Sequence, residues 1–501
     1  MKSSPIPLWL AIFLVLIALA YTGFFLSLTN VPFLDAPDHL ARAVIMKSLW
    51  FDSNSPFQGT FTATHFFMPY MLPDLGLIGL LKLLGVQIAY PVWSTLTMLA
   101  LTFAIWLYAR QLLTTAWAIA AATLCGWFFA TNYFYILGFF AFQWGLAASF
   151  VALGAIEALR RGKSRLWIAI YVLASFVAYG THMACFAILG ALIGAIGFVR
   201  VRLHEQSWLQ LIGELLPFTI LVAYHLLLVP AHPEAIRGFI THSAVLFKTA
   251  RFFASMFLRQ SYVLDGALIV LFLGILVTAL RGAQIDFTRR WPLPLICGLS
   301  FLGYLALPIG WGAGYYIDMR FLPYFFIPLF LFALGEMELT QPESGRIRFL
   351  LIACCLLAVA NLASLATFLP KQNREVGQYR EALDSIPAGQ IVFPIDTRRA
   401  DGRSRPMLHA ASLYEVDRAG YTPYVPSANR GGPAGYFSDL SQIYRPDQNW
   451  FVNHQVPDWG KILSTYDYGI ITKPWQPQSF DLSHLQPHFE NAAAVVFRVQ
   501  R

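Results

Sequence analysis

Charged residues are scarce in this chain. Only 12% of its 501 residues are Asp, Glu, Lys or Arg, whereas 57% are hydrophobic, and the mean hydropathy is +0.56. Soluble domains carry about twice that share of charge, so the composition excludes an ordinary soluble protein. Many stretches reach the roughly 20 apolar residues that a membrane-spanning helix requires. We therefore predict an α-helical polytopic membrane protein.

Two markers of eukaryotic secreted domains are also missing. The five cysteines, Cys125, Cys185, Cys297, Cys354 and Cys355, all lie in apolar segments, so they suggest neither a disulfide framework nor a CxxC metal motif. No Asn-x-Ser/Thr sequon with an allowed middle residue occurs. An extracytoplasmic domain that lacks both features favours a bacterial cell inner membrane.

The apolar stretches predict about eleven transmembrane helices. Their approximate ranges are 7–29, 88–109, 113–131, 143–159, 166–181, 184–200, 207–229, 266–281, 293–309, 321–337 and 348–368. The first is too long for a signal peptide and lacks a small-x-small cleavage site. The short pair 166–181 and 184–200 leaves open a single re-entrant unit.

Basic loops give the orientation of these helices, because short loops rich in Lys and Arg stay in the cytoplasm. With eleven crossings the loops near 160–165, 200–202, 281–290 and 346–348 all fall on one side. The N-terminus is then cytoplasmic and the C-terminus extracytoplasmic. These loops account for much of the net charge of +8, so we predict no nucleic-acid partner.

The chain changes character near residue 370. We assign residues 1–369 to a transmembrane domain, with an outer loop and juxtamembrane helices at 30–87, and residues 370–501 to a small periplasmic α/β domain. The second segment is polar and rich in Pro, Gly and Tyr. Its predicted elements are a helix at 375–386 and strands at 390–395, 468–472 and 494–499.

A polar stripe follows the first apolar segment. Asp35, Asp38, His39 and Arg42 are spaced i, i+3, i+4 and i+7, which places them on one face of a helix. Helix capping explains part of it: Asp35 as N-cap, Pro37 in the first turn, and an ion pair between Asp38 and Arg42. Capping leaves His39 unexplained, so we also consider a catalytic site.

Several short motifs, taken in order, resemble the GT-C superfamily of membrane glycosyltransferases, which includes bacterial aminoarabinose transferases and protein O-mannosyltransferases. The acidic loop directly after the first membrane helix is typical of that superfamily. The motifs are residues 30–43 (NVPFLDAPDHLARA), 65–70 (HFFMPY), 80–86 (LLKLLGV), 138–146 (GFFAFQWGL), 179–183 (YGTHM) and 318–323 (DMRFLP). Many members have adjacent Asp-Glu, whereas Asp35 and Asp38 are three residues apart.

The resemblance implies transfer of a hexosyl or pentosyl group, with inversion, from a polyprenyl-phosphate donor to an extracytoplasmic lipid, glycan or protein. A carboxylate accepts the acceptor's proton, and cations stabilise the departing phosphate. Asp35 or Asp38 suits the first role, and we favour Asp35, with Asp38 restrained by Arg42. The candidates for substrate or phosphate binding are His39, Arg42, His65, His182, Tyr315, Asp318, Arg320 and Arg251.

Plainer interpretations of these candidates stay open. Arg320 also suits an interfacial snorkelling arginine, His182 a packing residue, and Tyr315 an interfacial aromatic belt. Asp35 and His39, spaced i and i+4, permit a divalent metal ion, but the sequence fixes no third ligand.

The long outer loop at 230–265 places Arg237, Lys248, Arg251 and Arg259 against the usual charge bias. These four cations suit either an anionic lipid head group or the solvated face of an amphipathic helix.

Other classes of membrane protein were weighed. A transporter or flippase for lipid-linked glycans needs ionisable residues inside the membrane, and Glu214 is nearly the only one; no inverted repeat is visible. A lipid-linked glycan ligase or polymerase is closer in chemistry, and a non-enzymatic scaffold would leave the Asp35 stripe as helix caps. The early acidic loop favours the glycosyltransferase.

Overall fold

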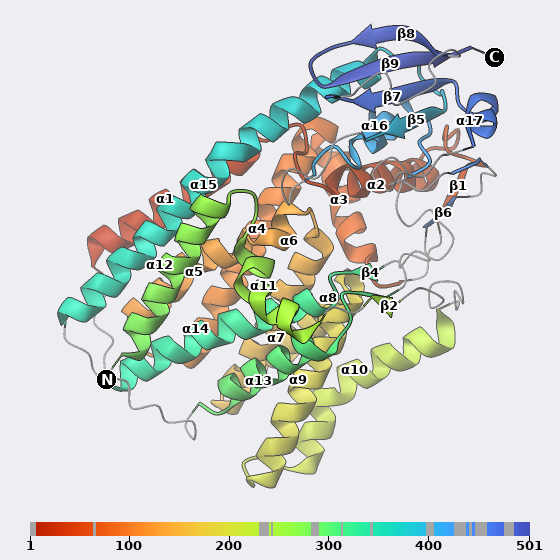
Figure 1. Cartoon of the computed structure of the whole chain (residues 1–501). Coiled ribbons are helices and arrows are strands. Elements are labelled where there is room, and N and C mark those ends of the chain that lie inside the picture. The colour runs from red at the N-terminus through yellow and green to blue at the C-terminus, as the bar shows by residue number, and fades with distance from the viewer. Residues whose placement is uncertain are drawn as a thin grey trace.

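The computed structural model describes residues 7–63, 67–229, 240–241, 244–281, 290–311, 314–340, 344–396, 405–424, 437–439, 443–445, 458–474 and 485–500. Most of these residues form a bundle of apolar helices, and a small sheet domain lies at one end of it (Figure 1).

Apolar helices account for the whole bundle. Within the described residues, eight are long and apolar enough to cross a membrane: α1 (Leu8–Leu26), α4 (Val86–Leu112), α7 (Phe140–Arg160), α9 (Met183–Arg202), α10 (Trp208–Leu228), α12 (Tyr262–Leu280), α14 (Leu322–Leu339) and α15 (Ser344–Asp384). Shorter apolar helices are α5 (Ala116–Ala130), α8 (Leu166–Thr181) and α13 (Pro292–Ala306). Each predicted range overlaps one of these helices, while the number of membrane crossings stays a prediction.

Smaller elements connect the long helices. The helices are α2 (Ala36–Phe51), α3 (Met71–Leu84), α6 (Tyr133–Ile136), α11 (Val245–Phe257) and the 3-10 turn η2 (Asp318–Phe321). Short strands are β1 (Phe61–Ala63), β2 (Ile240–Thr241), β3 (Gly310–Trp311) and β4 (Gly314–Tyr315). β2, β3 and β4 form one small antiparallel sheet.

One face of helix α11 packs among the membrane helices, and its other face is exposed. The rings of Phe128 and Phe257 stack at 4.7 Å, and Phe257 meets Phe326 edge-on at 5.0 Å, so α11 packs against α5 and α14. Such aromatic pairs add to the energy of burial. The apolar face of this amphipathic helix is therefore part of the core of the bundle.

Two of the four cations in this segment are buried in ion pairs. Lys248 lies 3.0 Å from Asp318, and Arg259 lies 2.9 Å from Asp265, with Asn361 and further side chains of α15 completing its hydrogen bonds. A buried charge needs such partners. Neither the lipid head group nor the solvated basic face describes these two residues; Arg237 lies outside the described residues.

The C-terminal segment forms a mixed sheet of order β5-β7-β9-β8. Its elements are β5 (Val392–Ile395), η3 (Ala410–Ser412), α16 (Leu413–Arg418), β6 (Phe437–Asp439), α17 (Trp459–Thr465), β7 (Tyr468–Thr472), β8 (Leu485–Glu490) and β9 (Ala494–Val499). β5 is parallel to β7, whereas β9 is antiparallel to both β7 and β8. The three predicted strands are confirmed, and β8 was not predicted.

The helix predicted at 375–386 is not a separate element. It forms the last turns of α15, which continues without a break past Pro370 from the bundle into the sheet domain (Figure 1). The sheet domain also contacts the bundle laterally. η3 and α16 pack on α2, and β1 of the first loop pairs with β6. The first loop and the C-terminal domain therefore share an interface.

Candidate active site

The carboxylate stripe lies where α2 begins. Pro37 occupies the first turn, where its fixed φ favours helix initiation, and the backbone carbonyl of Asp35 accepts the N–H of His39 at 3.2 Å. The side chain of Asp35 makes no capping hydrogen bond. Capping therefore explains Pro37 and leaves the Asp35 carboxylate available for another role.

The turn before α7 holds the backbone of Asp35 in place. The backbone N–H of Asp35 donates to the carbonyl of Leu137 at 3.0 Å. Gly138 follows with φ +78°, and a Cβ at this position would lie 3.0 Å from the nitrogen of Ala36 and 3.2 Å from that of Asp35. Only glycine suits both this φ and this close approach.

We expect Gly138→Ala to lower the transfer activity strongly and the melting temperature only a little. The new methyl group pushes the Asp35 loop away from α7 and adds strain of about 1–3 kcal/mol. Gly59→Ala is the matched control, because Gly59 also has positive φ but has open space around its Cβ position. Equal losses of transfer activity in the two variants, measured alongside their melting temperatures, would contradict the role assigned to Gly138.

Arg42 forms its ion pair with a neighbouring helix. Its Nε and Nη2 lie 2.5 Å and 2.8 Å from the two carboxylate oxygens of Asp74 in α3, and both side chains are almost fully buried. The predicted ion pair between Asp38 and Arg42 is therefore wrong. Asp74 presents both oxygens to the planar guanidinium, and this bidentate geometry is stronger than a single i,i+4 contact.

His39 contacts the same arginine. Its Nδ1 lies 2.7 Å from Nη2 of Arg42. Burial lowers the pKa of His39 well below its usual value, and the charges of Arg42 and His409 add to the effect, so the ring is neutral and accepts this hydrogen bond. Nδ1 of His39 is thus engaged by Arg42. Among the described residues, no three His, Cys, Asp or Glu side chains converge as a metal site.

The C-terminal domain supplies two partners for the carboxylates. Nδ1 of His409 lies 2.7 Å from Oδ2 of Asp38, and its Nε2 lies 3.5 Å from Oδ1 of Asp35. The hydroxyl of Ser412 donates to Oδ1 of Asp38. Both oxygens of Asp38 are therefore engaged, and this side chain is 2% exposed, whereas that of Asp35 is 27% exposed.

These surroundings shift the pKa values of Asp35, Asp38 and His409. Burial raises the pKa of Asp35 to about 7, with His409 opposing the shift. Burial also raises the pKa of Asp38, again opposed by His409. Burial alone would lower the pKa of His409, but the adjacent Asp38 and Asp35 raise it to about 9. Near neutral pH the imidazole of His409 is therefore protonated, and the protonated and ionised forms of Asp35 are both populated.

A second group of polar side chains lies on the other side of Asp35. Arg320, in η2, lies near enough to Asp35 to lower its pKa, and it donates a hydrogen bond to Tyr70. The ring of His182 meets Tyr70 edge-on at 4.8 Å; His182 is 3% exposed, and its Nδ1 has no hydrogen-bond partner in the described structure. Arg320, Tyr70 and His182 thus form a cationic corner beside the carboxylates.

The other predicted site residues do not join these groups. Asp318, next to Arg320, is held by Lys248. Arg251 lies on the exposed face of α11 over the ring of Phe247, at 4.2 Å. The strand position of Tyr315 is described but its side chain is not, and His65 lies outside the described residues.

Several residues of the site were missed from the sequence. His409 and Ser412 come from the distant C-terminal segment, and Asp74 and Tyr70 belong to the start of α3. Tyr90 of α4 lies within electrostatic range of Asp35, and its hydroxyl has no partner in the described structure. Of these residues, Asp74 is the one that the sequence could have indicated. It is a charged residue in the first turn of an otherwise apolar helix.

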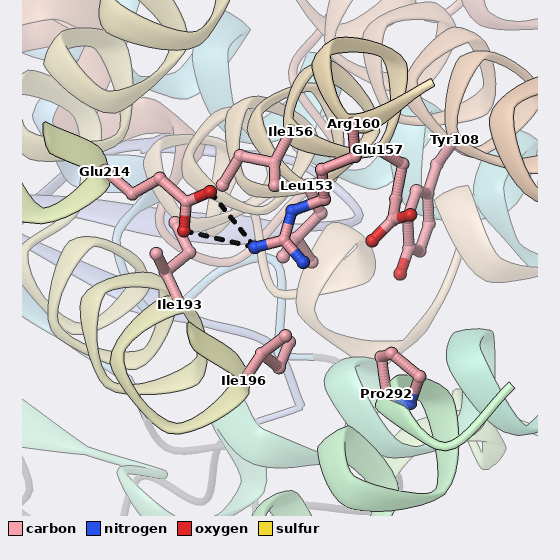
Figure 2. Close-up of a pocket in the computed structure, with 9 residues that line it drawn as sticks. All are labelled: Tyr108, Leu153, Ile156, Glu157, Arg160, Ile193, Ile196, Glu214 and Pro292. Atoms are coloured by element: carbon pink, nitrogen blue, oxygen red, sulfur yellow. Dashed lines mark hydrogen bonds and ion pairs between the residues drawn. The ribbon is translucent and has the colours of Figure 1, made fainter. Parts of the chain in front are cut away.

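A separate small cavity lies between α7, α9 and α10 (Figure 2). Its space is close to that of one water molecule. It is lined by Tyr108, Leu153, Ile156, Glu157, Arg160, Ile193, Ile196, Glu214 and Pro292. Arg160 points at Glu214 with its Nη2 3.0 Å from Oε1, so the carboxylate that a transporter would use is already paired.

Among the solved structures that this chain resembles, two match over nearly the whole length of both chains. ArnT from Cupriavidus metallidurans, in the apo state, is 12% identical with a TM-score of 0.53; the match covers 98% of this chain and 97% of ArnT. ArnT bound to undecaprenyl phosphate is 13% identical with a TM-score of 0.57 and the same coverage. No family model matches the sequence, and no curated protein does. The chain therefore has the ArnT fold.

Proposed function

We propose that this multi-pass membrane protein, which has the fold of ArnT, is a GT-C glycosyltransferase that takes a sugar from a polyprenyl phosphate. ArnT has been crystallised with undecaprenyl phosphate, and this supports a lipid of the same class as the donor carrier. The observation that carries the proposal is that a partly exposed carboxylate, Asp35, lies within electrostatic range of Arg320 in the cationic corner.

The proposed reaction inverts the anomeric carbon. The acceptor hydroxyl attacks that carbon, the bond from carbon to phosphate oxygen breaks, and the phosphate leaves with the electron pair. Asp35 takes the proton that the hydroxyl loses. Arg320 stabilises the charge that develops on the leaving phosphate, because a guanidinium donates two parallel hydrogen bonds to phosphate oxygens. Tyr70 orients Arg320, and the free Nδ1 of His182 offers a further phosphate contact.

The acceptor and the sugar are open within this proposal. A lipid, glycan or protein acceptor on the extracytoplasmic side of a bacterial inner membrane is consistent with the predicted orientation. A flippase is disfavoured because the sequence shows no inverted repeat. A lipid-linked glycan ligase or polymerase shares the chemistry and differs in the donor, so donor specificity separates the two.

The proposal is tested with purified protein in proteoliposomes. The donors are polyprenyl-phosphate hexoses and pentoses, each offered with envelope fractions of the producing cell as acceptors. We expect release of polyprenyl phosphate that requires both the acceptor fraction and an intact Asp35. Activity with a polyprenyl-diphosphate glycan alone would favour the ligase, and release by none of these donors, with binding intact, would contradict the proposal.

The transfer rate is expected to follow a bell-shaped pH profile. Asp35 must be ionised to act as a base, so the rate rises as the pH passes its pKa of about 7. His409 must stay protonated beside Asp38, so the rate falls above its pKa of about 9. Measurement of kcat/KM from pH 5 to 10 checks both limbs. A rate that is constant between pH 5 and 7 would exclude Asp35 as the base.

A further inference from the structure

The segment that carries His409 is fixed on α2. His409 precedes η3, and three residues later Ser412 donates to the other oxygen of Asp38. Leu413 and Tyr414 of α16 are fully buried, and Glu415 accepts hydrogen bonds from the backbone N–H and the hydroxyl of Thr422. The imidazole is therefore held by a rigid part of the C-terminal domain.

This arrangement treats the two carboxylates differently. Asp38 is clamped at both oxygens by His409 and Ser412, while Asp35 meets only the far nitrogen of the same ring, at 3.5 Å. One ring thus links a fixed carboxylate to one that keeps an exposed surface. The charged ring attracts the Asp35 carboxylate from the side of Asp38 and so favours one direction of it relative to α2.

The bridging imidazole also supplies positive charge where the carboxylates need it. Two arginines of the membrane domain, Arg42 and Arg320, act on Asp35, but Arg42 is already paired with Asp74. The remaining charged or titratable groups around the bridge are Arg405 of the same segment, Glu415 of α16, His39 of α2 and Tyr90 of α4. His409 is the cation that lies between the two carboxylates.

We propose that His409 is a positioning residue through which the C-terminal domain completes the active site: it clamps Asp38 and aims Asp35 at the acceptor hydroxyl. This inference rests on the proposed glycosyl transfer, with Asp35 as its base. It assigns the sheet domain a direct part in the reaction, because the membrane domain alone leaves both carboxylates without their bridge.

Substitutions at His409 test the two contacts separately. His409→Ala removes both and should lower kcat by about 10²-fold, the typical cost of a misplaced catalytic group. The KM for the lipid donor should change little, because Arg320, Tyr70 and His182 contact the donor side. His409→Asn keeps a donor at the position of Nδ1, and His409→Gln one near Nε2, so each should recover part of the lost kcat.

A matched control separates positioning from folding. His488→Ala removes another histidine of the same domain, whose Nε2 contacts the carbonyl of Ser385, and should leave kcat and KM unchanged. A His409→Ala variant with the kcat of His488→Ala would overturn the inference. So would a loss of kcat that tracks the melting temperature and that neither Asn nor Gln recovers, since His409 would then only join the domains. Full activity of both Asp35→Asn and Asp38→Asn would instead overturn the proposed function.

Discussion

Asp35→Asn is expected to lower sugar transfer by about 10²–10⁴-fold, the usual contribution of a general base. The amide has the shape of the carboxyl group but accepts no proton. Asp35 is partly exposed and its side chain caps no helix, so the variant should fold normally and bind the donor as well as the wild type. Steady-state kinetics with a saturating lipid donor, together with a melting curve, measure both expectations.

Asp38→Asn is the matched comparison, because it changes the neighbouring carboxylate in the same way. Asp38 is buried and clamped by His409 and Ser412, so its replacement leaves a buried imidazolium without its closest partner, and breaking a buried pair costs about 3–5 kcal/mol. We expect a clear fall in melting temperature with a smaller fall in kcat. A stable Asp38→Asn variant without activity, beside an active Asp35→Asn variant, would make Asp38 the base.

The sequence predicted the start of α2 correctly, because the residues that begin a helix are neighbours in the chain. Asp35 before the helix and Pro37 in its first turn mark where α2 begins, whatever the rest of the chain does. The partners of its polar side chains are set by tertiary packing. The bond between Ser412 and Asp38 spans 374 residues, and no periodicity in one sequence carries information over that distance.

The failure at Arg42 has the same cause. An i,i+4 pair with Asp38 is the best partner that a single helix offers, worth about 0.2–0.5 kcal/mol on its surface. In the folded chain α3 lies beside α2 and brings Asp74 into bidentate contact in a buried place, where a stronger pair wins. Lys248 in the 230–265 loop is a similar case. A contact with a lipid head group and a solvated face were both considered for it, and neither is right, because its partner Asp318 is distant in the sequence.

In the C-terminal domain the prediction succeeded where strands are buried. Residues 494–499 are apolar and β-branched, and β9 pairs there on both sides. β8 was missed because it is an edge strand, mostly exposed, with Pro487 and an irregular register beside it, and such strands lack the alternating pattern. The change in composition near residue 370 marks where the chain enters the sheet domain. It does not mark the end of a helix, because α15 continues from Ser344 to Asp384.

Arg320→Gln is expected to lower kcat by about 10²–10³-fold, as removal of one group that stabilises a leaving oxyanion does. It should also weaken binding of undecaprenyl phosphate, whereas binding of the uncharged polyprenol should not change. Arg320→Lys keeps the charge but not the two parallel donors, so we expect it to restore only part of the loss. Binding measured in nanodiscs for both lipids and both variants gives the comparison.

The alternative to this role is an arginine that only anchors η2 at the membrane surface. In that case lysine would serve as well as arginine, and both lipids would bind alike to every variant. Arg110→Gln, an exposed arginine in the last turn of α4, is the control for general loss of surface charge and should behave as wild type. Because Arg320 lowers the pKa of Asp35, its removal should also move the acid limb of the pH profile upward. An anchoring arginine remote from the carboxylates would leave that limb unchanged. The shift of the acid limb therefore tests whether the cationic corner acts on Asp35.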